Sequence, residues 1–444
     1  MFLAHIPLTE ALTRRRGADI VSATAESLDM QQEFHRDRDS VPCKFNGLRV
    51  AIVHYWFVAR RGGERVVEVL AEMFPQADFY TLVLDRKALA PALQSRSFTT
   101  SFLQMLPGSK RYYRKLLPLF PLALEQFRLD DYDLVISSES GPAKGILTRT
   151  ETCHICYCHT PMRYLWDMYH DYRSTAPGGR LGRLFYTLTA HYVRTWDYMA
   201  SSRVDYFAAS SRNGAARIRK YYRRESTVIY PPVDIDSFSL SEGQDDFYLV
   251  VSPLVSYKRV DLAIAACNAL NRRLVVIGRG EEFPALAKMA GPTITFLGFQ
   301  PDPVVRDHYR RCRALLFAGE EDIGLTPIEA QASGRPVIAY GRGGALETVR
   351  GFFTDESIDP QISTGVFFRE QSVESLVDAI RAFESVESRF DPAFIRAQMV
   401  RFDVGRFKVE MSEFIAEKLR EFPRRKTHEE PIPTHFSSPS PNAS

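Results

Sequence analysis

The feature that most constrains the fold is an alternation of apolar strand-like runs and helix-like stripes, which occurs twice along the chain. The first series starts at residues 48–54, which lead into a glycine turn at 60–64 and then into a helical stripe. The second starts at 248–252 and includes the run 274–277. Two prolines within residues 230–234 interrupt regular structure between them. This pattern predicts an α/β protein with two Rossmann-like, doubly wound domains that face a cleft.

Composition and length are those of an ordinary globular enzyme. The 444 residues are enough for two or three domains, and 25% of them are charged. The net charge of +3 is too small for a protein that wraps nucleic acid. Six cysteines in so long a chain do not form a disulfide framework, which favours a reducing compartment. We see no signal peptide and no apolar run of about 18 residues, so we expect a cytoplasmic protein, soluble or bound at a membrane surface.

The most informative motif is the segment of residues 321–329. It follows an apolar run, and Thr326, Pro327 and Glu329 have the spacing of an N-cap, a first helical residue and a capping box. Gly324 allows the backbone to pass close to a ligand. Free amides at a helix start, with the positive end of the helix dipole, predict a site for a diphosphate.

Two carboxylates flank this predicted anion site. Glu321 and Glu329 are suited to hold the hydroxyls of a sugar and a ribose. Taken alone, Glu329 could be only a capping residue and Glu321 only an exposed loop acid. The combination with the preceding strand, the following helix and a second glycine turn at residues 341–344 favours a nucleotide-sugar site.

Three other segments have two interpretations. The cysteines and histidines of residues 153–159 have some features of a zinc site, but strand alternation places them on opposite faces, which favours buried core cysteines. The basic and apolar residues 110–122 could be an ordinary solvated helix, and we favour docking on anionic lipid slightly. His159, followed by Thr160-Pro161, is predicted to end a strand and precede a helix at the cleft, although a lone histidine there could be structural.

These motifs together resemble the retaining GT-B glycosyltransferases of family four, from residue 48 to residue 422. The motifs that carry the resemblance are Gly62-Gly63-Glu64, His159-Thr-Pro161, Pro231-Pro-Val-Asp234, Tyr257-Lys258-Arg259, Gly278-Arg-Gly280 and the segment 321–329. The resemblance implies that the first domain holds the acceptor and the second the nucleotide sugar. It also implies that the last helix crosses back onto the first domain.

We therefore divide the chain into a flexible extension at 1–46, an acceptor domain at 47–231 and a donor domain at 232–403. The amphipathic helix 404–422 completes the acceptor domain, and the Pro- and Ser-rich residues 423–444 form a disordered tail.

The resemblance also implies roles for single residues. Glu321 would contact the transferred sugar, Glu329 the ribose, and Lys258 the leaving diphosphate, with no metal and no cofactor besides the donor. His159 would lie over the reacting carbon, and Arg163 could hold an acceptor phosphate. The remaining donor contacts would come from backbone and glycine positions: Gly62, Gly63, Gly278, Gly280, Gly324, Leu325 and Thr326.

One position departs from the family pattern. Pro253 stands where an arginine is common, and Arg259 is the candidate to replace that second phosphate contact.

The predicted function is transfer of a sugar to an acceptor hydroxyl with retention of configuration. Residues 159–166 are similar to those of bacterial mannosyltransferases that build surface polysaccharide on polyprenyl diphosphate. GDP-mannose is therefore the predicted donor, and a lipid-linked saccharide at the cytoplasmic membrane face is the predicted acceptor. A nucleotide-sugar epimerase and a non-catalytic nucleotide-sugar-binding protein are the alternatives.

Overall fold

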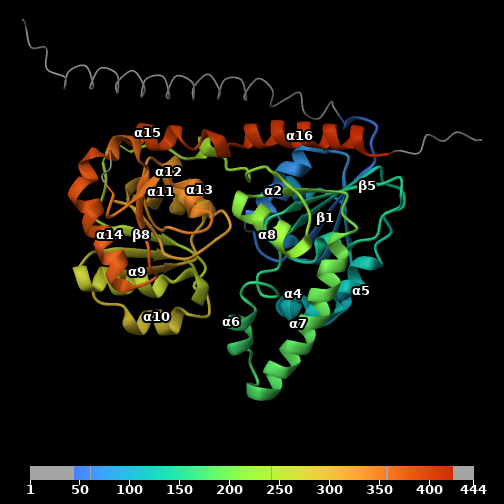
Figure 1. Cartoon of the computed structure of the whole chain (residues 1–444), viewed down its shortest axis with the longest axis horizontal. Coiled ribbons are helices and arrows are strands. Elements are labelled where there is room, and N and C mark those ends of the chain that lie inside the picture. The colour runs from blue at the N-terminus through green and yellow to red at the C-terminus, as the bar shows by residue number, and fades with distance from the viewer. Residues whose placement is uncertain (1–44, 61, 242, 357–358, 424–444) are drawn as a thin grey trace, which may run out of the picture.

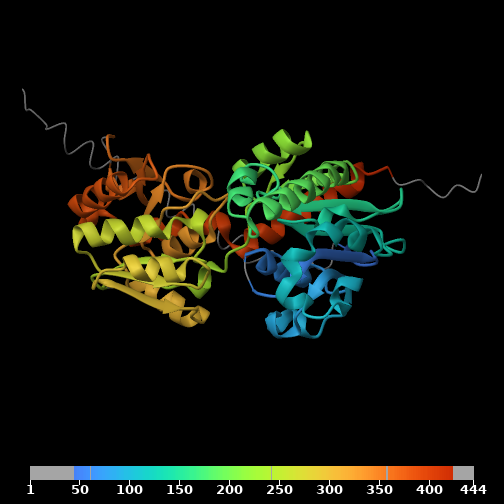
Figure 2. The ribbon, with the colours of Figure 1, turned by 90° about the horizontal axis from the view of Figure 1, so that it is seen from below.

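The computed structural model describes residues 45–60, 62–241, 243–356 and 359–423. The chain forms two α/β halves side by side, joined by a linker and by the last helix (Figure 1). Figure 2 shows the same two halves from below, with α16 behind the first half. Most of the predicted N-terminal extension and C-terminal tail lies outside the described residues.

The first half is built on a parallel seven-stranded sheet in the order β3-β2-β1-β4-β5-β6-β7. Its central strands are continuous runs of buried residues, as expected of a parallel sheet covered on both faces. The strands are β1 Val50–Phe57, β2 Asp78–Leu84, β3 Phe98–Thr100, β4 Leu134–Glu139, β5 Cys153–Cys158, β6 Tyr206–Ala209 and β7 Thr227–Val228. The helices are α2 Gly62–Met73, α3 Pro91–Gln94, α4 Ser109–Tyr112, α5 Phe120–Glu125, α6 Tyr169–Ser174, α7 Gly179–Ser201 and α8 Arg212–Tyr222.

The second half repeats this design with shorter connections. Its parallel sheet has the order β10-β9-β8-β11-β12-β14-β13. The strands are β8 Tyr248–Val251, β9 Leu274–Ile277, β10 Ile294–Gly298, β11 Leu315–Phe317, β12 Val337–Tyr340, β13 Gly351–Phe353 and β14 Gly365–Phe368. The helices are α9 Val260–Leu270, α10 Phe283–Met289, α11 Asp302–Arg311, α12 Leu325–Ala332, α13 Ala345–Thr348, α14 Val373–Val386 and α15 Pro392–Ala397. The predicted fold class is confirmed.

The chain passes between the two halves twice, near residues 233 and 403, and these two segments lie side by side. The backbone amide of Val233 in the linker donates to the Phe402 carbonyl (2.8 Å), and Val233 forms a parallel bridge with Asp403. Helix α16, Val404–Glu421, begins there, capped by the Asp403 side chain. Its residues Phe407 and Met411 lie in the core of the first half. The last helix therefore belongs to the core of the half that begins the chain.

Two local predictions about helix starts are wrong. Residues 160–168 form turns and bends, and α6 begins only at Tyr169, so Thr160-Pro161 does not open a helix. The predicted glycine turn at 60–64 is also different, because Gly62 and Gly63 are the first residues of α2.

Candidate active site

The predicted anion site lies where β11 ends and α12 begins. Gly324 is the N-cap of α12 with a φ of 74°, a backbone conformation that glycine adopts without strain. A Cβ at this position would lie 2.8 Å from the Phe317 ring. Among the described residues no side chain caps α12, so the amides of Leu325 and Thr326 stay available to a ligand.

The predicted capping box is wrong. Thr326 lies inside α12 rather than at its N-cap, and the Glu329 carboxylate does not return to the helix start. Instead Glu329 accepts from Arg65 Nη1 (2.6 Å) and from the Tyr309 hydroxyl (2.8 Å). Burial alone would lower the pKa of Arg65, but the charge and hydrogen bond of Glu329, together with Asp302, raise it overall. Glu329 is thus a buried acid held from two sides rather than a capping residue.

Lys258 and Glu321 form an ion pair beside this helix start. Their side chains bond directly, Nζ to Oε1, and are only 13% and 23% exposed. Lys258 ends a single helical turn after β8, and a Cβ at Gly319 would lie 3.0 Å from the Lys258 Cα. Gly319 therefore allows the loop after β11 to carry Glu321 against Lys258. A cation and a carboxylate of this kind can hold a diphosphate and a hydroxyl group respectively.

The first half supplies the opposite wall of the cleft through α2. A Cβ at Gly62 would lie 2.8 Å from the Leu325 Cδ1 atom, so the start of α2 packs directly against the start of α12. A Cβ at Gly63 would lie 2.9 Å from the Tyr55 hydroxyl and 3.5 Å from His159 Nε2. The structure therefore brings Gly62, Gly63, Leu325 and His159 together, although they come from both halves of the chain.

His159 follows β5 and lies next to Gly63 at the start of α2. Its Nε2 atom is 3.0 Å from the Ser138 hydroxyl. Burial, with a smaller contribution from His54, lowers the pKa of His159 to about 3. The imidazole is therefore neutral at physiological pH and can act as a hydrogen-bonding group rather than as a cation.

A buried ion cluster fixes the first half behind His159. Lys144 lies 3.2 Å from Glu139 Oε1 and also bonds Asp197 of α7, with all three side chains inaccessible to solvent. Burial raises the pKa of Glu139 to about 7, although Lys144 opposes this. Asp197 also accepts from the Trp166 indole (2.8 Å), which ties the turns after His159 to α7.

Arg163 lies in those turns and reaches across the cleft. Its Nη1 atom donates to the Glu320 carbonyl (3.0 Å), and its guanidinium lies 5.9 Å from the centre of the Tyr257 ring. Lys258 Nζ lies 5.3 Å from the same ring centre. The predicted acceptor-binding arginine therefore lies next to the Lys258–Glu321 pair.

The two other glycines and Arg259 have different surroundings. A Cβ at Gly278 would lie 1.8 Å from the Ser252 carbonyl, and one at Gly280 would lie 2.1 Å from the Leu254 carbonyl. Contact with the backbone on either side of Pro253 therefore explains both glycines without a ligand. Arg259 forms an ion pair with Asp261, 3.1 Å away, at the start of α9. Gly278, Gly280 and Arg259 therefore take no part in the Lys258–Glu321 ion pair.

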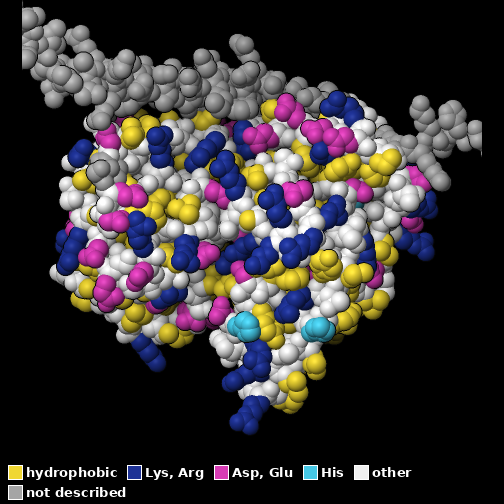
Figure 3. Space-filling model, viewed as in Figure 1, with side chains coloured by type: hydrophobic (Ala, Val, Ile, Leu, Met, Phe, Trp, Pro, Cys, Tyr) yellow, Lys and Arg dark blue, Asp and Glu magenta, His cyan; other side chains and the backbone are white. Residues whose placement is uncertain are grey.

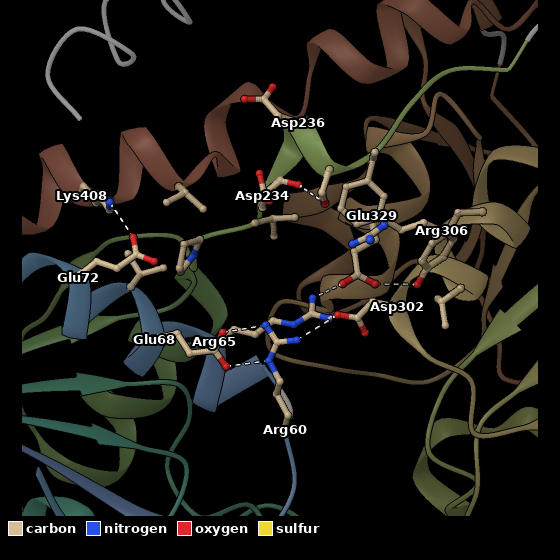
Figure 4. Close-up of a pocket in the computed structure, with 18 residues that line it drawn as sticks. Arg60, Arg65, Glu68, Glu72, Asp234, Asp236, Asp302, Arg306, Glu329 and Lys408 are labelled. Atoms are coloured by element: carbon tan, nitrogen blue, oxygen red, sulfur yellow. Dashed lines mark hydrogen bonds and ion pairs between the residues drawn. The ribbon is translucent and has the colours of Figure 1, made fainter. Parts of the chain in front are cut away.

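A cavity of about 490 Å³ lies between the halves beside Glu329, on the linker side (Figure 4). Arg60 and Arg65 point into it from the first half, and Asp302 meets them from α11 (Figure 4). Arg60 Nη1 lies 3.1 Å from Asp302, and Arg65 contacts Asp302 at 3.8 Å as well as Glu329. Sequence reasoning missed Arg65 and Asp302, since no motif links residues this far apart in the chain.

A second set of contacts joins the halves at α8. Asn213 Nδ2 donates to Asp322 (3.0 Å), and Arg217 Nε lies 3.1 Å from the same carboxylate. The backbone amides of Arg212 and Asn213 donate to Glu347 (2.8 and 2.9 Å). Sequence reasoning missed this set as well, although the position of Asp322 beside Glu321 was a usable signal. The halves thus contact each other on both sides of the Lys258–Glu321 pair.

The segment of residues 153–159 is a core strand. Cys153 packs in one core cluster and Cys156 and Cys158 in another, as strand alternation predicts. His154 Nε2 lies 2.8 Å from the Ser137 hydroxyl. Within the described residues, no three His, Cys, Asp or Glu side chains are placed to hold a metal ion.

Each half of the chain matches the model of a known protein family. Residues 60–237 match the family model described as Glycosyltransferase Family 4, and residues 234–394 match the one described as Glycosyl transferases group 1. Two consecutive stretches of the chain, each less than half of its length, thus match glycosyltransferase family models, and the α/β architecture is that of the GT-B class.

Similar proteins of known activity match only in part. Glycogen synthase of Pseudomonas paraeruginosa is 31% identical over 156 residues, which is 33% of this chain and 28% of that protein. The chain thus spans little more than a quarter of that relative. Alpha-1,3/1,6-mannosyltransferase ALG2 of Homo sapiens is 22% identical over 318 residues, 62% of this chain and 73% of that protein.

Two solved structures share the fold. Anabaena Alr3699/HepE in complex with UDP covers 84% of this chain and 100% of its own, at a TM-score of 0.57 and 16% identity. Sucrose-phosphate synthase from Thermosynechococcus elongatus covers the same shares at a TM-score of 0.59 and 14% identity.

Proposed function

We propose that this protein transfers a sugar from a nucleoside diphosphate to an acceptor hydroxyl and retains the anomeric configuration. The observation that carries the proposal is the junction of the two halves at Gly62 and Leu325. The uncapped start of α12, the Lys258–Glu321 pair and the neutral His159 all meet at that junction.

The reaction follows from the charges at this junction. The bond between the anomeric carbon and the diphosphate oxygen breaks, and negative charge grows on the leaving phosphate. Lys258 and the amides of Leu325 and Thr326 stabilise that charge. The acceptor oxygen then bonds the same face of the anomeric carbon, and its proton passes to the leaving phosphate.

His159 and Glu321 would orient the sugar. Because burial keeps His159 neutral, it can share a hydrogen bond with a sugar hydroxyl without repelling the oxocarbenium-like carbon. Glu321 is bonded to Lys258 here, so donor binding would bring a hydroxyl to Glu321 and a phosphate to Lys258. Glu329, held by Arg65 and Tyr309, is the acid we assign to the ribose.

GDP-mannose is the proposed donor, and a lipid-linked saccharide in surface-polysaccharide synthesis is the proposed acceptor. The match to ALG2 mannosyltransferases supports mannose, because it extends over 62% of this chain, whereas the match to glycogen synthase extends over 33%. Arg163, which reaches over the cleft beside Lys258, supports an acceptor that carries a phosphate.

A donor screen tests this proposal. Thermal unfolding is measured with GDP-mannose, UDP-glucose and ADP-glucose, and the donor held by the native state raises the apparent stability, by about 2.7 kcal/mol at 100 times its Kd. We expect GDP-mannose to give the largest shift.

NMR of the donor and products then separates the reaction classes. Incubation with a short-chain polyprenyl-diphosphate saccharide should give the α-mannoside, and incubation without acceptor should leave the sugar unepimerised. Epimerised donor would identify an epimerase, and binding without turnover of any acceptor or donor would identify a non-catalytic binding protein.

A further inference from the structure

Helix α7, residues Gly179–Ser201, projects from the first half of the molecule (Figure 1). Its 23 residues span about 34 Å at the usual rise of a helix. Its inner face is fixed to the domain by Ala190, Val193 and Asp197, all of them buried. The helix is thus rigidly attached through its C-terminal half, while its N-terminal half extends outward.

The outer face of α7 is apolar. Five large hydrophobic side chains there are between 52% and 76% exposed: Leu181, Leu184, Phe185, Leu188 and Tyr192. They are spaced three, four, seven and eleven residues from Leu181, which places all of them on one face of a helix, opposite Ala190 and Val193. A solvent-facing helix surface is normally polar, so an apolar stripe on this side needs a partner.

A second apolar region lies next to it. The 3-10 helix of residues 113–119 packs against α7, with Leu117 and Trp196 packed against one core cluster. Around it, four large hydrophobic side chains are exposed on α4, α5 and their flanking loops: Met105, Tyr112, Leu119 and Leu122. The two regions together form one surface, which we call the apolar ridge.

The charges around the apolar ridge are mainly basic. Asp85, which pairs with Lys110 at 3.2 Å, and Asp171 of α6 are acidic exceptions. Residues 105–122 contain four basic side chains, and residues 172–196 contain four more, so the two segments hold eight Lys and Arg with no Asp or Glu. The whole chain carries nearly balanced charges, 57 basic against 54 acidic. Figure 3 shows the lower projection with hydrophobic and basic side chains side by side. The set comprises Lys110, Arg111, Arg114, Lys115, Arg173, Arg180, Arg183 and Arg194.

We propose that the apolar ridge docks on an anionic lipid bilayer. The apolar stripe would enter the boundary between headgroups and acyl chains, and the basic side chains would contact lipid phosphates. A second copy of this chain is a poorer partner, because a two-fold interface would place two sets of eight cations against each other. None of the helices in the described parts of the chain is long and apolar enough to cross a bilayer.

The apolar ridge lies close to the mouth of the cleft. The ring of Tyr172 in α6, the short helix before α7, lies 6.1 Å from the ring of Tyr164. The guanidinium of the adjacent Arg163 lies 5.9 Å from the centre of the Tyr257 ring. Tyr257 directly precedes Lys258, so a bilayer under α7 would bring a lipid-linked acceptor close to the Lys258–Glu321 pair. Docking deepens the proposed function, but it is measured without donor or acceptor, so the two proposals can fail separately.

Vesicle co-sedimentation of the full-length protein tests the docking. The probes are sucrose-loaded vesicles of phosphatidylcholine alone and of phosphatidylcholine with phosphatidylglycerol. We expect binding to the anionic vesicles, with an affinity that falls roughly fivefold for each basic residue removed near the surface. The variants are the triple substitution Leu184→Gln, Phe185→Gln, Leu188→Gln and the triple substitution Arg111→Ala, Arg114→Ala, Lys115→Ala.

Matched control variants carry the same kinds of substitution on the second half of the molecule. Leu240→Gln, Phe283→Gln, Met289→Gln removes exposed apolar groups from the second half, and Lys288→Ala, Arg381→Ala, Arg389→Ala removes basic groups there. We expect both test variants to lose at least tenfold in vesicle affinity, with unchanged donor-induced thermal shifts and unchanged control binding.

Three results would overturn the proposal. One is equal binding to neutral and anionic vesicles by wild type and both test variants. The second is an absence of wild-type binding to any vesicle. The third is a concentration-dependent dimer that the apolar triple substitution abolishes, without vesicle binding, which would make this surface an interface between two copies.

Discussion

The two halves of the molecule share a sheet design but use it differently. Both are seven-stranded parallel sheets with the same order for the first five strands. In the second half, Lys258 and Glu321 lie on short loops and are bound to each other, a pairing that a ligand can replace. In the first half, the charged groups behind His159 are fully buried and bound to one another.

The Lys258–Glu321 pair is thus suited to exchange its partners for a ligand, whereas the buried Lys144 cluster is suited to support the fold. A partly exposed ion pair loses little when a phosphate and a hydroxyl replace its members. A buried cation between two carboxylates has no such alternative, because removing one partner leaves a charge without compensation. We therefore expect substitution of Lys258 to change turnover and substitution of Lys144 to change folding.

The largest effect is expected for Lys258→Ala. Loss of the cation beside the leaving diphosphate should lower kcat about 10³-fold, or about 4 kcal/mol in activation free energy. The free energy of unfolding should change by less than about 1 kcal/mol, because the side chain lies in the cleft. Steady-state kinetics and urea unfolding measure the two quantities, with Lys288→Ala on α10 as the control. Normal turnover in Lys258→Ala would remove the distinction between the halves.

Lys144→Met should have the opposite profile. It leaves Glu139 and Asp197 buried without their cation, so we expect a loss of about 3 kcal/mol in the free energy of unfolding. Equilibrium urea unfolding measures this loss, with Lys288→Met as the control. A change below about 1 kcal/mol would show that the cluster does not support the first half.

The pH dependence of stability should also come from the first half. Burial lowers the pKa of His154 to about 3, whereas the unfolded chain has a histidine pKa near 6.5. Because the unfolded state binds the proton first, the stability from neutral His154 is complete above pH 6.5 and is lost as the pH falls. Between pH 6.5 and 4.5 this loss amounts to about 2 kcal/mol.

The comparison of wild type with His154→Gln isolates this contribution. Urea unfolding at several pH values should show a shallower decline in the variant, whatever its stability at pH 7. Other groups, including Glu139 with its raised pKa, contribute equally to both proteins and cancel. Parallel declines in the two proteins would contradict a neutral, buried His154.

The smallest effect is expected for Tyr309→Phe. The Tyr309 hydroxyl orients Glu329, so its removal should weaken nucleotide binding by about 1 kcal/mol, roughly fivefold in Kd. Calorimetric titration with GDP measures this change. Tyr248→Phe is a matched control, because its hydroxyl bonds Glu384 elsewhere in the second half. Equal Kd values of Tyr309→Phe and wild type for GDP would contradict the assignment of Glu329 to the nucleotide.

Local patterns allowed the strands and the fold class to be predicted from sequence. Side chains of a strand point alternately to its two faces, so the sequence predicted which residues of β5 share a face. In the structure one face carries Cys153, Ile155 and Tyr157, and the other carries Cys156 and Cys158. The start of β8 and the whole of β9 were likewise visible as short apolar runs bounded by turns.

Contacts between distant residues could not be predicted. A capping box for Glu329 was reasonable from its neighbours, but Arg65, which is 264 positions away, and Tyr309 bind that carboxylate in the folded chain. The Lys144 cluster likewise joins three segments that no spacing rule connects. The sequence around Gly278 and Gly280 predicted a loop that contacts the nucleotide. In the structure, both glycines pack against backbone carbonyl groups.

A crystal structure with bound GDP-mannose would show directly whether the start of α12 holds the donor diphosphate. We predict the diphosphate within hydrogen-bonding distance of Lys258 Nζ and the amides of Leu325 and Thr326, with the ribose at Glu329 and the hexose between His159 and Glu321. A well-occupied nucleotide bound away from the start of α12 would contradict the account.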